Sequence, residues 1–200
     1  MRPCPPSSSQ NSNIHTECSP LLSLNLIPPT LPFAESAFLT GPPQAINLWV
    51  GDGRAITTMH RDPYENVYVV LKGVKVFTLV PPYMGGCLKQ GFFRKGRWGV
   101  EAGEDVIVED EDRRKDVKWI EDDPHDDAGL LEHVKPITIR VQAGECLYLP
   151  AMWFHEVRSE GISVAVNYWY DMEFNTPVYA MSEALNGIIG RENDPNPERA

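Results

Sequence analysis

From Ile46 onward the sequence consists of short runs of β-branched and aromatic residues, separated by glycine, proline or acidic breaks. The runs are INLWV, AITTMH, NVYVVLKG, VKVFTLV, DVIVE, ITIRVQ, CLYLP, HEVRS and ISVAVNYWY. No stretch of helical periodicity lies between them, whereas parallel strands need helical crossovers. The pattern therefore predicts an all-β fold, a sandwich or barrel, instead of a βαβ sheet.

The first 44 residues have a different composition from the β region. They are rich in proline, serine and asparagine, and contain proline pairs at 5–6, 28–29 and 42–43. Proline fixes its own backbone and restricts the residue before it, so these pairs favour short extended or turn pieces. We predict that residues 1–44 form an irregular lead-in that lies over the core.

One helix is predicted near the end of the chain. Thr176 can cap it, Pro177 suits its first position, and apolar residues then recur near the helical period. Its apolar stripe could pair with a second copy, giving a homodimer, or cover the sheet. We therefore expect a lead-in (1–44), one β domain (45–175), and a C-terminal helix with a fraying tail (176–200).

Size and charge exclude several classes of function. Two hundred residues with 42% hydrophobic content form one substantial core, and a net charge of -10 opposes a nucleic-acid surface. No run approaches the roughly 20 apolar residues that cross a bilayer. Four cysteines without a CxxC pair favour a reduced setting, so we expect a cytoplasmic or nuclear protein; Cys146 is predicted to be packed.

The negative charge is concentrated in one segment. Residues 101–127 contain thirteen acidic and four basic residues. A solvated excursion between strands is the simpler interpretation, and His125 and His133, in or just beyond it, are predicted to be solvated. The functional interpretation is a surface that attracts a cationic, lysine-bearing partner.

Three side chains could form a metal site. His60 and Asp62 are two residues apart, so on a strand they leave the same face. His155 follows the proline-ended run CLYLP. Two imidazoles and one carboxylate are typical of the facial triad that holds Fe(II) and leaves positions open for other ligands. An HxD pair alone is common, so this hypothesis needs further support.

Lys75 supplies that support, because it shares a strand face with Phe77 and Leu79. A lysine among apolar neighbours either extends to water or meets an anion, since an unpaired buried ammonium is costly. An anion that arrives as a ligand, such as the far carboxylate of 2-oxoglutarate, would satisfy it. In ISVAVNYWY, small residues and Asn167 share one face, which leaves room for a polar ligand; an ordinary half-exposed strand gives the same pattern.

Three segments carry a resemblance to a known family: NLWVGDGRAITTMHRDPYENVYVVLKGVKVFTLVPP, GECLYLPAMWFHEV and AVNYWYDMEF. They resemble the JmjC-domain, cupin-like 2-oxoglutarate oxygenases, and most of all the small lysyl hydroxylases that act on developmentally regulated GTP-binding proteins. Members of that subfamily have also been described as histone-tail endopeptidases. The resemblance covers roughly residues 9 to 185. It implies a double-stranded β-helix, the jelly-roll fold of the cupins.

The resemblance also implies roles for single residues. His60, Asp62 and His155 would bind Fe(II), with 2-oxoglutarate and O2 as cosubstrates. Lys75 would pair with the 5-carboxylate of 2-oxoglutarate, and Thr57 would help to bind the same carboxylate.

Three more residues are implied to surround the cosubstrate. Asn66 and Asn167 would lie near its other end, and Trp169 would form a wall of the pocket. Family members carry a further strand before QNSN, with a tyrosine that contacts 2-oxoglutarate. Here MRPCPPSSS occupies that place and contains no tyrosine. We therefore expect a truncated or replaced beginning.

The function implied is hydroxylation of a lysine side chain in a protein partner, such as a GTP-binding protein. A metal-dependent peptidase at the same triad is an alternative, with Glu156 as a conceivable base, although adjacent strand residues point to opposite faces. A truncated, non-catalytic scaffold is a third. Histone demethylation is a weaker variant, because nothing here resembles an appended chromatin-reading module.

Overall fold

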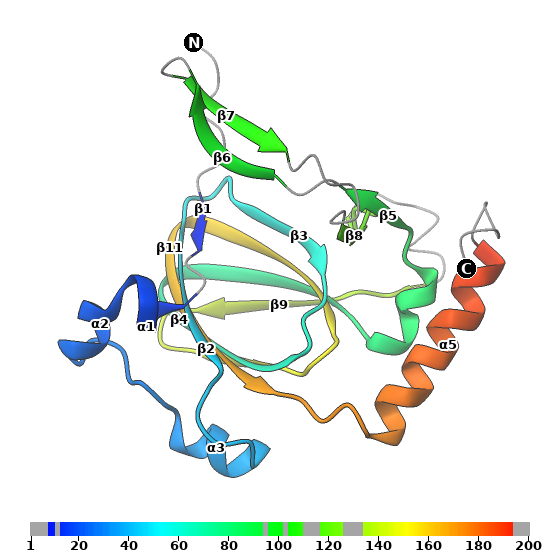
Figure 1. Ribbon diagram of the computed structural model, residues 1–200, viewed down its shortest axis with the longest axis horizontal. Coiled ribbons are helices and arrows are strands. Elements are labelled where there is room, and N and C mark those ends of the chain that lie inside the picture. The colour runs from blue at the N-terminus through cyan, green and yellow to red at the C-terminus, as the bar shows by residue number, and fades with distance from the viewer. Residues whose placement is uncertain are drawn as a thin grey trace.

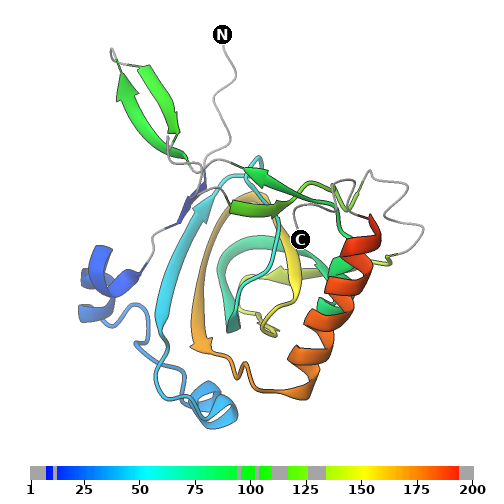
Figure 2. The ribbon, with the colours of Figure 1, turned by 45° about the vertical axis from the view of Figure 1, so that its right-hand side comes forward.

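The computed structural model describes residues 8–10, 13–93, 96–101, 104–109, 117–125 and 134–193. Its centre is one seven-stranded antiparallel sheet that curves around the middle of the molecule (Figures 1 and 2). The predicted all-β, jelly-roll fold is therefore confirmed. The strands of this sheet are β1 (Ser8–Gln10), β2 (Ala45–Gly51), β3 (Ile56–His60), β4 (Tyr64–Val80), β9 (Ile137–Gln142), β10 (Cys146–Leu149) and β11 (Phe154–Asp171).

The two long strands, β4 and β11, run through both halves of the sheet. The second half of β4 pairs with the start of β11, and the first half of β4 pairs with the end of β11. Each strand joins two of the runs that the sequence suggested were separate. The register shifts between Glu160 and Val164, opposite Gly73, whose φ is 75°. A Cβ at Gly73 would collide with the carbonyl oxygen of Ile162, so only glycine fits this bend.

The other strands extend each half of the curved sheet. β2 and β10 flank the half built from the start of β4, whereas β3 and β9 flank the half built from its end. β1 pairs with the outer edge of β2. This arrangement places the end of β3 beside the start of β11, where two of the predicted site residues lie.

The lead-in contains more regular structure than predicted. It forms three short helices, α1 (Ile14–Glu17), α2 (Ser19–Ser23) and α3 (Pro32–Phe38). Pro20 and Pro32 lie in the first turns of α2 and α3, where their missing N–H groups cost nothing. Ile14, Ile27 and Ala34 are buried against the sheet, so the lead-in completes a core cluster.

The long connection between β4 and β9 also departs from the prediction. It holds a 3₁₀ helix (Pro82–Cys87) and two two-stranded sheets, although the sequence suggested a single strand there. Residues 102–103, 110–116 and 126–133, with His133 and much of the acidic segment, lie outside the described residues. The strands are β5 (Gln90–Phe93), β6 (Gly96–Glu101), β7 (Glu104–Glu109) and β8 (Val117–Ile120).

The predicted C-terminal helix is present as α5 (Pro177–Asn193). The backbone N–H of Tyr179 donates to the Thr176 hydroxyl oxygen at 3.2 Å, which confirms the predicted cap. Asn186 joins α5 to the 3₁₀ helix, because it donates to the Pro82 carbonyl and accepts from the Gly86 N–H. No described helix has the length and apolar character needed to cross a membrane.

Cys146 is exposed, so the prediction that its thiol is packed is wrong. β10 is the last strand on its side of the sheet, and Cys146 begins that strand. Cys18, Cys87 and Cys146, the cysteines within the described ranges, are not joined by disulfides.

Candidate functional site

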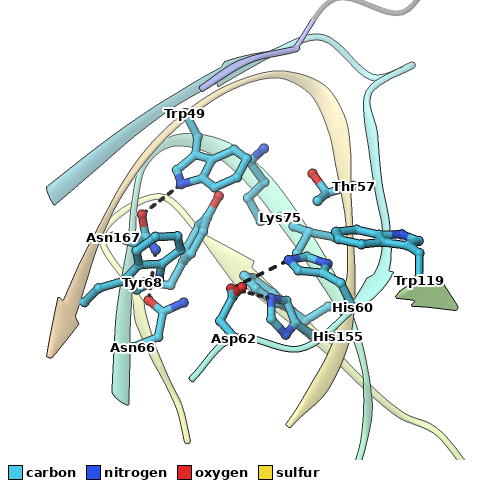
Figure 3. A pocket seen from close by; sticks show the side chains of 13 residues that line it. Trp49, Thr57, His60, Asp62, Asn66, Tyr68, Lys75, Trp119, His155 and Asn167 are labelled. Carbon is cyan, nitrogen blue, oxygen red and sulfur yellow. Dashed lines mark hydrogen bonds and ion pairs between the residues drawn. The ribbon is translucent and has the colours of Figure 1, made fainter. Parts of the chain in front are cut away.

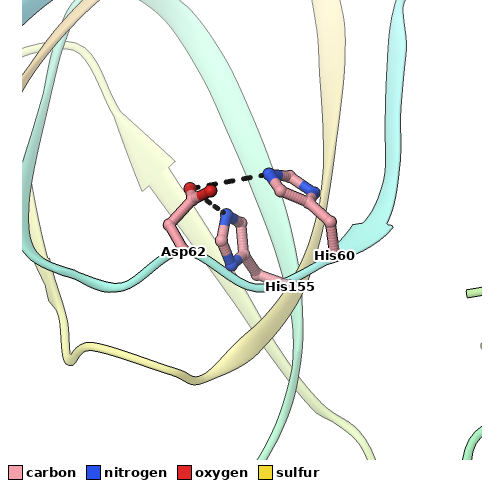
Figure 4. A group of neighbouring side chains, drawn as sticks. All are labelled: His60, Asp62 and His155. Atoms are coloured by element: carbon pink, nitrogen blue, oxygen red, sulfur yellow. Dashed lines mark ion pairs between the residues drawn. The ribbon is translucent and has the colours of Figure 1, made fainter. Parts of the chain in front are cut away.

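His60, Asp62 and His155 come together at one point (Figure 4). His60 ends β3, and its partner across the antiparallel ladder is His155, near the start of β11. The Nε2 atom of each histidine lies 3.6 Å from Asp62 Oδ2. One ligand atom from each of the three residues lies within 4.8 Å of the others. The side chains that the sequence proposed as a triad therefore converge.

Both imidazoles are held with Nε2 free to bind. The Nδ1–H of His60 donates to the Thr58 carbonyl at 2.8 Å, and that of His155 donates to the Trp153 carbonyl at 3.0 Å. A carbonyl oxygen can only accept, so Nδ1 carries the proton and Nε2 keeps its lone pair. Burial, with the nearby charge of His60, lowers the pKa of His155 to about 4, so this ring is neutral at neutral pH.

Asp62 supplies the negative charge of the group. Burial works to raise the pKa of its carboxyl group, but the attraction of the neighbouring His60 and His155 outweighs burial, and the pKa is lowered. The backbone N–H of Met152 donates to the Asp62 carbonyl at 2.9 Å and fixes the loop that carries it. Two imidazoles and one carboxylate suit a divalent cation such as Fe(II).

The triad opens into a cavity of about 210 Å³ (Figure 3). Strands β3, β4 and β11 contribute most of its wall. All eight residues singled out from the sequence line it: Thr57, His60, Asp62, Asn66, Lys75, His155, Asn167 and Trp169.

Lys75 lies in the same cavity as the triad. Lys75 is 5% exposed, and its Nζ donates to the Ser159 hydroxyl at 2.9 Å. Ser163 contacts the same hydroxyl at 3.0 Å. Burial lowers the pKa of Lys75 to about 8, and no carboxylate pairs with it among the residues described. A buried ammonium with hydroxyl partners alone is stabilised by an anion, so this part of the cavity suits a carboxylate ligand.

The two predicted amides belong to a hydrogen-bonded chain. The Trp49 indole donates to Asn167 Oδ1 at 2.9 Å, and Asn167 Nδ2 donates to Asn66 Oδ1 at 3.2 Å. Trp169 stacks on Tyr64, with ring centroids 4.8 Å apart and planes at 6°. This chain and this stack fix the orientation of the cavity wall.

Sequence reasoning missed Trp119, which lies in the acidic segment. Its ring stacks on His60 at 5.1 Å and 8°, and its indole donates to the Thr58 hydroxyl at 2.9 Å. The prediction that this whole segment is solvated is therefore wrong for β8. A large aromatic residue within the charged run VKWIEDD was the available signal.

Tyr68 was also missed, and it places a phenol in the cavity. Its ring meets Phe77 edge to face at 5.0 Å. Burial raises the pKa of Tyr68, so the hydroxyl stays protonated and can donate. This phenol is carried by β4, as are three other residues of the cavity wall, Asn66, Lys75 and Phe77.

A second group of possible metal ligands lies on the other side of the sheet, at Asp123, His125 and Glu156. His125 is exposed, as predicted, and its ring nitrogen also lies 2.9 Å from Glu156 Oε1. Arg158 Nε donates to the same oxygen at 2.6 Å. The Arg158 guanidinium supplies the positive charge that a metal ion would bring, so these residues form an ion-pair network. Glu156 is held there and is not a base for the triad.

Comparisons with known proteins agree with this site. The cupin-like domain family matches residues 3–176. "JmjC domain-containing protein E" of Dictyostelium discoideum is 35% identical over 188 residues, covering 82% of this chain and 52% of that protein. "Lysine-specific demethylase JMJ32" of Arabidopsis thaliana is 34% identical over 171 residues, covering 78% and 49%.

A human relative shows the same level of similarity. "Bifunctional peptidase and (3S)-lysyl hydroxylase JMJD7" is 36% identical over 162 residues, covering 79% of this chain and 51% of that protein. The chain spans about half the length of each of these three relatives. The family match and the three identities together show that the chain belongs to the cupin-like JmjC-domain family.

Proposed function

We propose that this protein is an Fe(II)- and 2-oxoglutarate-dependent oxygenase that hydroxylates a lysine side chain of a protein partner. One observation carries the proposal: an open two-histidine, one-carboxylate group and a buried lysine line the same small cavity. The triad suits a metal with open positions, and the lysine suits a dicarboxylate bound beside that metal.

Each residue has a definite task in this proposal. His60, Asp62 and His155 would hold Fe(II), which supplies the oxidising chemistry when 2-oxoglutarate and O2 are bound. Lys75 would pair with the far carboxylate of 2-oxoglutarate, and the Thr57 hydroxyl would assist it.

The remaining residues would shape the cavity. Asn66 and Asn167 would orient the cosubstrate through the chain that begins at Trp49. Trp169 would wall the cavity and exclude water from it.

The choice of lysine rests on the relatives and on charge. One relative is called a lysyl hydroxylase and another a lysine-specific demethylase. The net charge of -10 favours a cationic partner, and a lysine-bearing GTP-binding protein is the substrate that we propose. A cytoplasmic or nuclear location stays a prediction from the cysteine content.

Peptide hydrolysis is the competing function, since the human relative is also called a peptidase. Hydrolysis needs a base beside a metal-bound water but no 2-oxoglutarate. Glu156, the base suggested from the sequence, bonds to Arg158 and His125 instead. Lys75 also has no part in hydrolysis. The cavity therefore supports oxygenation better.

The test is succinate release coupled to hydroxylation. The protein is incubated with Fe(II), 2-oxoglutarate and lysine-bearing GTP-binding proteins, and both succinate and the substrate mass are measured. We expect succinate and the addition of one oxygen atom at a lysine, with both absent in His60→Ala. Equal signals from the wild type and His60→Ala would remove the proposal, and cleavage without 2-oxoglutarate would favour the peptidase.

A further inference from the structure

A second groove, of about 640 Å³, lies outside the metal cavity. Figure 1 shows the end of β11 between α3 and α5, and the groove is lined by residues of these elements and of the loop 150–153. No residue lines both spaces, but neighbouring residues divide between them: Asn66 and Trp169 line the metal cavity, whereas Glu65 and Asp171 line the groove. The groove therefore lies against the elements that form the site.

The groove has apolar walls that are open to solvent. Leu39, Tyr83 and Val178 line it and are 86%, 53% and 76% exposed. Phe38 and Trp153 add aromatic surface. Contiguous exposed apolar surface of this kind marks an interaction site.

The charged residues that line the groove are all acidic: Glu65, Asp171, Glu173 and Glu183. Glu183 is paired with Arg61 at 2.6 Å. Asp171 and Glu173 are exposed and pair with no cation within the described ranges. The groove thus combines apolar walls with carboxylates available to a cationic partner.

Backbone strain gathers at the same place. Leu39 and Met152 line the groove with φ of 58° and 66°, in the left-handed region that these residues seldom adopt. The N–H of Met152 donates to the carbonyl of Asp62, a member of the triad. One loop therefore walls the groove and supports the metal site, so a segment bound in the groove lies next to that site.

We propose that this groove docks a cationic segment of the protein substrate. An apolar side chain of that segment fills the space between α3 and α5, and its lysine or arginine side chains meet Asp171 and Glu173. The inference rests on the proposed function, since it names the surface that presents the target lysine. Charge complementarity selects a basic segment over an acidic one.

The test uses a fluorescein-labelled peptide in which lysine and leucine alternate, and a second peptide with glutamate in place of every lysine. Binding is measured by fluorescence anisotropy to the wild type and to the double variant Asp171→Lys with Glu173→Lys. The matched control is Glu160→Lys, because Glu160 is an exposed glutamate before the bend of β11 that lines neither the groove nor the metal cavity. We expect about tenfold weaker binding of the lysine peptide by the double variant, no change in the control, and no binding of the glutamate peptide.

The proposed function is tested separately by Mn(II) and 2-oxoglutarate, measured as a rise in melting temperature. That rise in the double variant shows that it folds and keeps its metal site. Equal affinity of the lysine peptide for the wild type and a folded double variant would overturn the docking site, even if the enzyme hydroxylates its substrate. A second outcome would also overturn the docking site: the wild type is a dimer, the double variant is a monomer, and both bind the peptide equally. The groove would then bind a second copy of this chain. Groove-dependent peptide binding without hydroxylation would support the docking site and count against the proposed function.

Discussion

His60 and His155 lie opposite each other across β3 and β11, with ring centroids 4.2 Å apart. Each ring is also fixed through Nδ1 by a carbonyl two residues earlier in the chain. The cross-strand pair brings together residues far apart in sequence, and the two carbonyl contacts select the nitrogen that faces Asp62. The site is therefore formed before any ligand arrives.

Trp119 should strengthen metal binding although it is not a ligand. Its ring covers one face of His60 and its indole is fixed by Thr58. We predict that Trp119→Ala weakens Mn(II) binding by about tenfold, because groups that orient a ligand tune metal affinity. Calorimetric titration measures this, with Trp119→Phe as the control that keeps a stacked ring. Wild-type affinity in Trp119→Ala would show that the stack does not position His60.

Lys75 should control 2-oxoglutarate binding without controlling the metal. We predict that Lys75→Met keeps Mn(II) affinity and weakens 2-oxoglutarate binding about 10- to 100-fold, as expected for loss of a hydrogen bond to a charged group. Titration of 2-oxoglutarate into the Mn(II)-loaded protein gives this value. An unchanged dissociation constant would place the cosubstrate carboxylate elsewhere.

The same lysine gives a pH dependence with a defined sign. Burial lowers the pKa of Lys75 from 10.5 to about 8, so above pH 8 the free protein loses the charge that attracts a carboxylate. We predict that 2-oxoglutarate affinity falls above about pH 8. Between pH 8 and 10.5, Lys75 binds a proton in the unfolded chain more often than in the folded protein. The contribution of Lys75 to the free energy of unfolding therefore rises with pH across this range. Lys75→Met should lack that rise in urea denaturation.

Asn167 should be needed for stability as well as for the cavity. In Asn167→Ala the Trp49 indole loses its acceptor and Asn66 loses its donor. A buried polar group without a partner costs about 1–3 kcal/mol, so we predict a loss of that size in the free energy of unfolding. Urea denaturation checks the value. A loss well below this range would mean that water replaces both bonds.

Thr176 offers a test away from the site. Its hydroxyl caps α5, and removing a side-chain cap costs about 1 kcal/mol. We predict that Thr176→Ala lowers the free energy of unfolding by this amount, whereas Thr176→Ser keeps the hydroxyl and loses little stability. An equal loss in both variants would assign the effect to the lost methyl group.

Spacing and side-chain chemistry predicted much of the site. The short separation of His60 and Asp62 predicted that their side chains meet, although β3 ends at His60 and Asp62 lies in the loop after it instead of on the same strand face. Lys75 among apolar residues indicated a buried ammonium that needs an anion. The cap at Thr176 also follows from local chemistry. These inferences depend on residues close in sequence, or on the chemical type of a single residue.

Other features depend on tertiary pairing that the sequence does not encode locally. The register that sets His155 opposite His60 is a long-range property, and so is the return of Trp119 to the site. The breaks at Gly73 and Gly161 suggested separate strands, because positive φ at glycine permits either a turn or a bend within one strand. The lead-in helices form because burial of Ile14 and its neighbours outweighs weak local propensity.

Calorimetric titration of Mn(II) into the wild type, His60→Ala, His155→Ala and His125→Ala tests the central claim most directly. His125 belongs to the ion-pair network on the other side of the sheet, so it serves as the matched histidine control. The account predicts one Mn(II) per chain, lost in His60→Ala and His155→Ala and retained in His125→Ala. Binding that persists in both triad variants, or that disappears with His125, would contradict it.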